Sequence, residues 1–422
     1  MWKIYRIILL WICVILIDLI VNAEGSDEEL VYVQAVWRHG DRAPTKLPYP
    51  NDEYKETSWP RGWGEITNVG IMQMYELGQF FRTRYASFIT NYNGEDVTMI
   101  SSKSNRTIAS ALAVLRGFFP ASGQEVWLGN EQWQPIPFQI ATTNAMLKPT
   151  SFDCLKYELE TEKENEMLVR NINKKYANFF EFLANVTGFK MVDFKKAASL
   201  YNIQREIDHN MTQPAWVYQT WSQFDNETTI DIIKNLKRIY RISKFNSSQK
   251  ARLRGGLLME DWISRAKNVS LGLPVTPRKI KLHSAHDGTL LALMYALGVG
   301  NNLLIPYASC AIMEIYKKTN NHTTVKFFYK NGTTVYQLAL PGCPSVDNCT
   351  ITQVAKAVSG RTVRSLQQLN EICSSASSGY IATGFLTIGY FNTPSVAAMM
   401  KINIRNMAHD HISNVWKDLS NS

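Results

Sequence analysis

The stretch RHGDRAPT, residues 38–45, follows directly on LVYVQAVW, residues 30–37. The run at 30–37 is apolar and rich in Val, Tyr and Trp, which predicts a buried β-strand that ends before Arg38. Ligands of open α/β sheets bind beyond the carboxyl ends of the strands. Two guanidiniums at such a place raise the free energy unless an anion lies between them. Guanidinium groups match phosphate geometry, so Arg38 and Arg42 predict a phosphate site.

His39 lies between these two cations in the sequence. Positive neighbours disfavour the protonated imidazole, which keeps a lone pair available for nucleophilic attack. Gly40 allows the backbone to turn sharply. For an isolated Arg-His pair, a solvated basic cluster would be the better interpretation. The full pattern Arg-His-Gly-x-Arg-x-Pro is rare by chance, and it predicts His39 as a nucleophile.

A second motif, SAHDGTLL at 284–291, has matching chemistry. The run at 278–285 predicts a strand and the run at 288–298 a helix, whose N-terminus favours an anion. Asp287 is the predicted general acid for a departing alkoxide. The helix N-terminus should lower its pKa, whereas a bound phosphate and a low working pH favour the protonated acid. The alternative is that Asp287 is only a helix cap.

The order of the predicted elements indicates an α/β fold. A strand at 30–37 is followed by a helix at 68–89, a strand at 97–102 and a helix at 106–119. This alternation predicts a mainly parallel sheet with helices on both faces. In the first helix, the predicted buried stripe consists of Val69, Leu77, Phe80 and Phe88.

The middle of the chain, by contrast, is charged and helical in pattern, and short strands in hairpins are predicted near residues 312–340. This change in composition and pattern along the chain predicts an α/β core interrupted by a helical cap. The predicted parts are a signal peptide at 1–23, the core at 24–149 and 276–373, the cap at 150–275 and a C-terminal extension at 374–422.

The N-terminus has the pattern of a secretory signal. Lys3 and Arg6 precede the apolar run IILLWICVILIDLIV, and VNA predicts cleavage after Ala23. Asp18 within the run leaves an uncleaved anchor as the alternative. Cleavage would change the formal charge from +9 to +8. Mild basicity spread along the chain suits small anionic substrates and gives no case for nucleic-acid binding.

Glycosylation signals and cysteines also favour the secretory pathway. Asn-x-Ser/Thr sequons occur at Asn185, Asn210, Asn226, Asn246, Asn268, Asn321, Asn331 and Asn348. This density predicts an N-glycosylated extracellular or lysosomal protein. Once Cys13 has left with the signal, the five remaining cysteines are Cys154, Cys310, Cys343, Cys349 and Cys373. An odd number predicts at least one thiol outside intramolecular disulfides.

Together, RHGDRAPT and SAHDGT resemble the histidine acid phosphatase family. The runs SWPRGWGEITNVGIMQMYELGQFFRTRY, NRTIASALAVLRGFFP, QWQPIP, PYASCAIMEIY and LPGCPS are also similar to its pattern. The resemblance covers residues 30–373. It implies a phosphoglycerate-mutase-like α/β core with an inserted helical cap, and hydrolysis of phosphate monoesters through a phosphohistidine, without metal or cofactor.

The resemblance implies a role for each residue that matches the motifs. His39 is the implied nucleophile and Asp287 the implied proton donor. The implied phosphate ligands are Arg38, Arg42, Arg106 and His286. Arg106 belongs to a formal sequon at Asn105, where a glycan would obstruct the site, so we expect Asn105 to be unmodified.

The same resemblance implies the disulfides Cys154–Cys373 and Cys343–Cys349. Cys310 matches a family cysteine whose partner lies near QREIDHN, where Arg205 stands in this chain. Cys310 is therefore expected to be a free, buried thiol.

Several weaker signals remain open. The run WQPIP around Trp133 resembles a dimer contact of a mammalian branch of the family, which makes a homodimer plausible, but Gln139 departs from the histidine expected there. The uncharged run 379–391 is a possible weak membrane anchor, although it is shorter than a membrane span needs. His283 and His286 are expected on opposite faces of a strand, so no metal site is predicted. The His-Asp pair at 409–411 lacks the following Gly-Thr, so it is not expected to be a second catalytic motif.

Three rival functions also fit parts of the pattern. A phosphoglycerate mutase-like enzyme shares the Arg-His-Gly core, but the signal and the Arg-x-Pro continuation disfavour it. A phytase or inositol-phosphate phosphatase is the alternative within the same fold. A secreted, non-enzymatic binding protein on this scaffold is the alternative from a different class, and the intact set of motif residues speaks against it.

Overall fold

The computed structural model describes residues 28–129 and 131–375. The predicted signal peptide, the possible anchor at 379–391 and the His-Asp pair at 409–411 lie outside these residues. Within them, no helix has the length and apolar character needed to cross a membrane.

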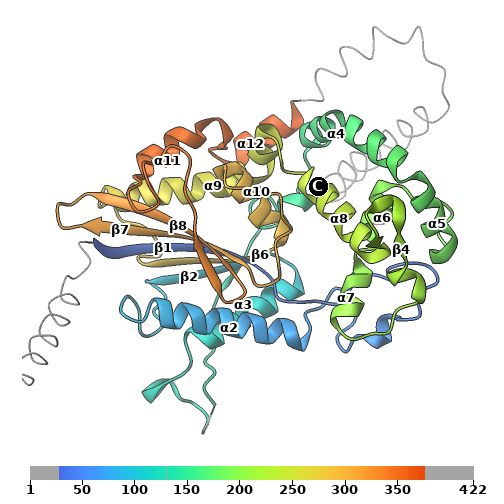
Figure 1. Cartoon of the computed structure of the whole chain (residues 1–422). Helices are drawn as coiled ribbons and strands as arrows, with labels where there is room; N and C mark the ends of the chain where they lie inside the picture. The colour runs from blue at the N-terminus through green and yellow to red at the C-terminus, as the bar shows by residue number, and fades with distance from the viewer. Residues whose placement is uncertain (1–27, 130, 376–422) are drawn as a thin grey trace, which may run out of the picture. The chain divides into compact units, whose positions relative to one another are not determined.

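A seven-stranded sheet forms the core, in the order β3-β2-β6-β1-β7-β8-β9 (Figure 1). Strands β3, β2, β6 and β1 are parallel to one another, whereas the pairs β1–β7, β7–β8 and β8–β9 are antiparallel. The fold is the predicted α/β class, and the parallel half carries the two motifs. The strands are β1 Glu28–Arg38, β2 Val97–Ser101, β3 Gln139–Ile140, β6 Ile280–Ala285, β7 Cys310–Lys318, β8 Thr323–Asn331 and β9 Thr334–Gln337.

Helices cover both faces of this sheet, as predicted. The alternation of β1 sends Val33, Ala35 and Trp37 into one hydrophobic cluster with α2 (Asn68–Arg84) and α3 (Asn105–Phe118). Tyr32 and Val36 point into the opposite cluster. That cluster is built with α9 (Ser248–Ser270), α10 (Asp287–Leu297) and α11 (Ile351–Val358).

The stripe predicted for the first helix is wrong at Val69, which is 54% exposed. The buried residues of α2 are Gly70, Met74, Leu77, Gly78 and Phe81. Two of these five are glycines, which permit close backbone contacts and contribute nothing to a hydrophobic pattern. A Cβ on Gly78 would lie 2.2 Å from the carbonyl oxygen of Val114, so α2 and α3 can pack this closely only with glycine there.

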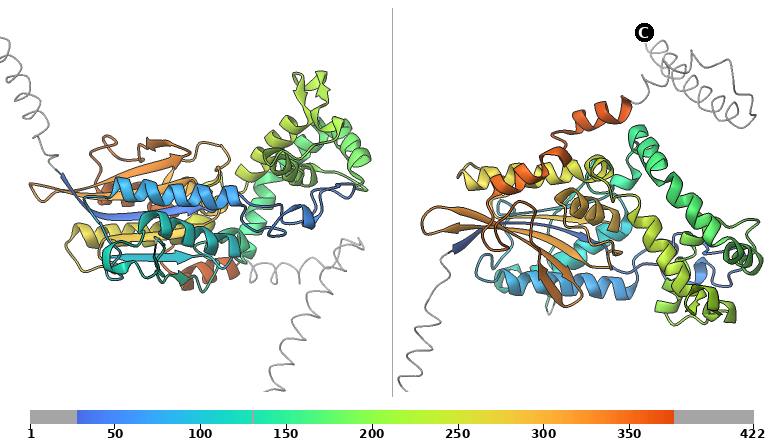
Figure 2. Two further views of the ribbon diagram at one scale, coloured as in Figure 1. Left: turned by 90° about the horizontal axis from the view of Figure 1, so that it is seen from below. Right: turned by 45° about the horizontal axis from the view of Figure 1, so that its top comes forward.

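A separate group of helices stands beyond one end of the sheet (Figures 1 and 2). Its own hydrophobic cluster contains Phe179, Leu183, Ile203, Ile232 and Leu236. The expected cap at 150–275 also includes α9, whose buried face packs in the cluster of the sheet. The elements of the group are α4 Leu155–Lys175, α5 Ala177–Thr187, α6 Phe194–Ser199, α7 Asn202–Asp208, β4 Thr220–Trp221, β5 Glu227–Thr228 and α8 Thr229–Ile242.

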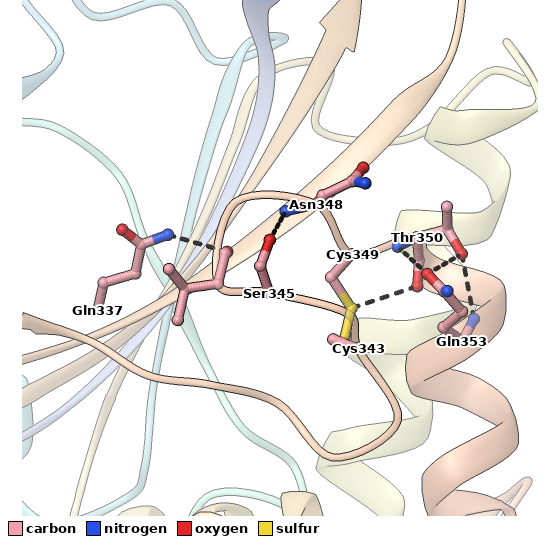
Figure 3. The surroundings of a disulfide bond; sticks show 8 residues. Gln337, Cys343, Ser345, Asn348, Cys349, Thr350 and Gln353 are labelled. Carbon is pink, nitrogen blue, oxygen red and sulfur yellow. Dashed lines mark hydrogen bonds between the residues drawn. A yellow bond between two sulfur atoms is a disulfide. The ribbon is translucent and has the colours of Figure 1, made fainter.

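Both implied disulfides are present. Cys154–Cys373 joins the start of α4 to α12 (Leu366–Ser374), 219 residues away in sequence. Cys343–Cys349 closes a short loop just before α11 (Figure 3). There Thr350 and Gln353 form a capping box that starts the helix. Cys310 is a free, fully buried thiol, as expected.

Candidate active site

The end of β1 positions the first group of site residues. The His39 backbone N–H donates to the carbonyl of Ala285 at 3.0 Å, which places the end of β1 beside the end of β6. Arg38 donates to the carbonyl of Ile305, and its Cζ lies 3.7 Å from the ring centre of Tyr307. The buried Nε atoms of Arg38 and Arg42 have no hydrogen-bond partner among the described residues. Unpartnered buried donors on two neighbouring guanidiniums are what an anion-binding site provides.

The ring of His39 is held in one tautomer by its neighbours. Nδ1 lies 2.8 Å from the carbonyl oxygen of Gly40, which can only accept, so Nδ1 carries the proton. Nε2 accepts a hydrogen bond from Nε of Arg106 at 3.0 Å. Burial lowers the pKa of His39 well below its ordinary value, and the charge of Arg38 lowers it further. The imidazole is therefore neutral at acidic pH, with the Nε2 lone pair directed toward the cations.

The backbone packs so closely at the turn after His39 that no side chain fits at residue 40. A Cβ on Gly40 would lie 2.2 Å from the carbonyl oxygen of Gly70, in the first turn of α2. Asp41 follows and accepts a hydrogen bond from the Thr67 hydroxyl at 2.6 Å, where Thr67 is the N-cap of α2. The contacts of Gly40 and Asp41 thus hold the motif against the start of α2.

The second motif brings His286 and Asp287 to the same place. The ring centres of His39 and His286 are 5.4 Å apart, and Nε2 of His286 lies 2.8 Å from the Ser102 hydroxyl. Burial lowers the pKa of His286 to about 3, with a further contribution from Arg106. His286 is the N-cap residue of α10 and does not belong to β6, which ends at Ala285, so the expectation that it shares a strand with His283 is wrong.

Asp287 is the first residue of α10, and its carboxylate is paired with a helix of the other group. Nε of Arg241, on α8, donates to Oδ2 at 2.8 Å. Burial alone would raise the pKa of Asp287, but Arg241 and Arg38 outweigh burial and hold it well below its ordinary value. The bond with Arg241 occupies only Oδ2 and so leaves Oδ1 for another partner.

The six predicted site residues thus converge from three segments, at 38–42, 106 and 286–287. Arg106 starts α3, and its exposed neighbour Asn105 donates to Glu65 at 3.0 Å. Burial lowers the pKa of Arg42, and the charges of Arg205, Arg106 and Arg38 act in the same direction. No cluster of three or more potential metal ligands occurs among the described residues.

Most of the chain matches a known protein family. Residues 29–330 match the profile of the histidine phosphatase superfamily (branch 2). The chain belongs to this superfamily. Rat prostatic acid phosphatase is 37% identical over 330 residues, covering 76% of this chain and 84% of the rat protein. Human lysosomal acid phosphatase is 33% identical over 336 residues, covering 78% of this chain and 77% of the human one.

Solved structures of phytases have the same fold. The apo form of a phytase from Hafnia alvei has a TM-score of 0.60 at 16% identity, covering 81% of this chain and 98% of that one. A phytase from Citrobacter braakii has a TM-score of 0.57 at 18% identity, covering 81% and 99%. At these identities the likeness concerns the fold alone.

This histidine phosphatase also places residues at the site that the sequence analysis did not predict. Arg241 and Lys237 come from α8, and Tyr307 from the loop before β7. Arg205, which stands where the family pattern has a cysteine, is buried and donates from Nε to the Tyr307 hydroxyl at 2.8 Å. No local pattern distinguishes these cations from the many others in the charged helices.

Helix α7 links the helical group to the core beside the site. Besides Arg205, it carries Glu206, and His209 follows at its end, with Nε2 2.6 Å from Oδ2 of Asp41. Glu206 and Asp52 are fully buried, and Oε1 of Glu206 and Oδ2 of Asp52 have no hydrogen-bond partner among the described residues. Two neighbouring buried carboxyl groups cannot both be charged without a large cost in free energy, so we infer that they share a proton. Burial raises the pKa of Glu206, and the charge of Asp52 raises it further.

This shared proton predicts that the fold weakens as pH rises. Above the ordinary Glu pKa of 4.5, the folded state keeps a proton that the unfolded state has lost. The free energy of unfolding therefore falls as pH rises, by up to about 1.4 kcal/mol per pH unit until the folded pair itself ionises. We expect Glu206→Gln to flatten this decline in thermal melts between pH 5 and pH 7.5. The exposed control Glu162→Gln should keep the native slope, and a native slope in Glu206→Gln would contradict the shared proton.

Proposed function

We propose that this chain is an acid phosphatase that hydrolyses phosphate monoesters through a phosphohistidine on His39. The observation that carries the proposal is the neutral His39 ring, whose Nδ1–H is held by Gly40 while Nε2 faces Arg106. The unpartnered Nε donors of Arg38 and Arg42 provide the phosphate site around it. The acid phosphatases that are 33–37% identical support the same activity.

The first step transfers the phosphoryl group to the histidine. Arg38, Arg42, Arg106 and His286 bind the nonbridging oxygens and stabilise charge in the transition state. Nε2 of His39 attacks phosphorus in line, and the bond from phosphorus to the ester oxygen breaks. Asp287, protonated in the bound complex, donates its proton from Oδ1 to that leaving oxygen.

The second step releases phosphate. A water oxygen attacks phosphorus, the bond from phosphorus to Nε2 breaks, and Asp287 accepts the proton of the water. Phosphate at the site brings negative charge near Asp287 and raises its pKa, which offsets the effect of Arg241. The low pKa of His39 in the free site keeps the nucleophile unprotonated under the acidic conditions that favour a protonated Asp287.

The experiment that tests the proposal is phosphate release from p-nitrophenyl phosphate across pH, with the native chain and a variant lacking the His39 imidazole. The native chain should be fastest below neutral pH. A native chain without turnover, or with a maximum above neutral pH, would contradict the proposed function.

We also infer a homodimer formed at the β3 edge of the sheet. β3 is a two-residue strand at the end of the strand order, and Ile140 on it is 50% exposed. The loop that leads to it exposes Trp127 and Leu128, at 58% and 57%. Apolar side chains beside an open edge favour contact with a second copy. Light scattering should give twice the chain mass, and Trp127→Ser should lower it, whereas Leu303→Ser, equally exposed elsewhere, should not.

We further infer passage through the secretory pathway to the exterior or the lysosome. Two disulfides support an oxidising compartment. Of the eight sequon asparagines outside the site, all but Asn331 are exposed. Digestion of the cell-expressed protein with an N-glycosidase, read as a loss of mass, tests the glycosylation.

A further inference from the structure

The site holds more positive charge than one phosphate group needs. The core contributes Arg38, Arg42 and Arg106, and the helical group contributes Arg205, Lys237 and Arg241. Asp287 is the carboxylate that pairs with one of these cations, Arg241. Asp41 bonds instead to Thr67 and His209. A bound phosphate monoester adds at most two negative charges, so the six cations retain a surplus.

The positive charge that one phosphate leaves unbalanced lies on the side of the helical group, chiefly at Lys237. Lys237 and Arg241 are four residues apart on α8, so they share one face of the helix, where like charges repel. Arg241 has Asp287 as its partner. Lys237 is half-buried and makes no hydrogen bond or ion pair within the part of the chain that the structure describes. A lysine is seldom buried in this way unless an anion compensates it.

Three elements locate the Lys237 ammonium group. Its charge interacts with Arg42 after β1, with Arg205 on α7 and with Asp287 on α10. Lys237 in turn lowers the pKa of Asp287. Lys237 lies one turn of α8 before Arg241, which contacts Asp287 at 2.8 Å. This places Lys237 on the side of Asp287 where the rest of an ester would extend from the leaving oxygen that Asp287 protonates.

We propose that Lys237, with Arg205 beside it, forms a second anion subsite that selects phosphate monoesters whose alcohol part carries another acidic group. This inference rests on the proposed function for the phosphate end of the substrate. The second group is a carboxylate or a second phosphate, since both accept hydrogen bonds from an ammonium group. Lys237 thereby determines specificity and takes no part in the bond-breaking step.

Burial gives the subsite a dependence on pH. It lowers the pKa of Lys237 to about 7, and the charges of Arg241, Arg205 and Arg42 act in the same direction, against Asp287. The ammonium form is therefore present at acidic pH and is lost as the pH rises through neutrality. Selection for the second acidic group should be strongest under acidic conditions.

Calorimetric binding to the full-length His39→Ala chain at pH 5.5 tests the subsite separately from turnover. Glycerol 2-phosphate and 2-phosphoglycerate form the first pair of ligands, because they differ in a hydroxymethyl group against a carboxylate. Fructose 6-phosphate and fructose 1,6-bisphosphate form the second pair and test a phosphate. We expect at least one doubly acidic ligand to bind about tenfold tighter than its partner, which corresponds to about 1.4 kcal/mol.

Adding Lys237→Met should bring that ratio close to one. Lys234→Met is the matched control, because Lys234 lies on the same helix but pairs with Asp231 in solvent. The ratio of the two affinities within a pair should also fall between pH 6 and pH 8, because Lys237 loses its charge there. The phosphate group that both ligands of a pair carry ionises in both, so its ionisation does not change the ratio. Equal affinities in both pairs, a ratio that survives Lys237→Met, or an equal loss for both members of a pair would overturn the subsite. Failure of native turnover would contradict the proposed function alone.

Discussion

Replacing His39 by alanine is expected to lower kcat for p-nitrophenyl phosphate by roughly 10⁴-fold or more, because the attacking atom itself is removed. The native chain, mixed with radiolabelled substrate and quenched without acid, should carry labelled phosphate, and the variant should carry none. The quench avoids acid because the phosphorus–nitrogen bond hydrolyses in acid. Both chains should be compared by thermal melting and circular dichroism.

The matched control is His322→Ala, which removes an exposed imidazole from the turn between β7 and β8. It should retain native activity and native labelling. A folded His39→Ala chain that still turned over the ester or still acquired the label would exclude His39 as the nucleophile. A native chain that binds phosphate without turnover or label would instead favour a non-enzymatic binding protein.

Replacing Asp287 by asparagine is expected to act selectively on esters with poor leaving groups. The ratio kcat/KM reports the steps through phosphoryl transfer to His39 when that transfer is irreversible. For glycerol 2-phosphate it should fall by about 10²–10⁴-fold, because an alkoxide needs a proton to depart. For p-nitrophenyl phosphate it should fall far less, since nitrophenolate leaves without one. Asparagine keeps the shape of the side chain and an oxygen for Arg241.

Pre-steady-state kinetics separate the two roles proposed for Asp287. If it also activates the water, the variant should release a burst of nitrophenolate and then turn over slowly. Asp231→Asn, at the exposed start of α8, is the control and should behave as the native chain. Equal losses of kcat/KM for both substrates would argue against Asp287 as the acid.

The local signals in the sequence were sufficient for much of the fold, and the six residues that they singled out lie together in the structure. The strand predicted at 30–37 is observed at 28–38, and the helix predicted at 106–119 is observed at 105–118. Prediction failed where packing is made by glycine, as in α2, where the buried stripe contains Gly70 and Gly78 and excludes Val69. Hydrophobic periodicity does not detect a contact that depends on the absence of a side chain.

The chemistry predicted for the ends of β1 and β6 follows from short stretches of sequence, because each motif and its strand are adjacent in the chain. RHGDRAPT predicted a phosphate site with a neutral imidazole, and SAHDGT predicted a carboxyl group beside a helix N-terminus. Both inferences depend on neighbours a few residues apart, so no knowledge of the folded chain was needed.

The distant charges that act on these residues can be identified only in the folded chain. Arg241 lies 46 residues before Asp287, and Arg205 lies 102 residues before Tyr307, yet both pairs are in hydrogen-bond contact. Electrostatic interaction depends on distance and burial in space, and sequence separation determines neither. The ion pair on Asp287, and the position of Lys237 without a partner among the described residues, therefore emerge only when α7 and α8 pack beside the carboxyl ends of the parallel strands.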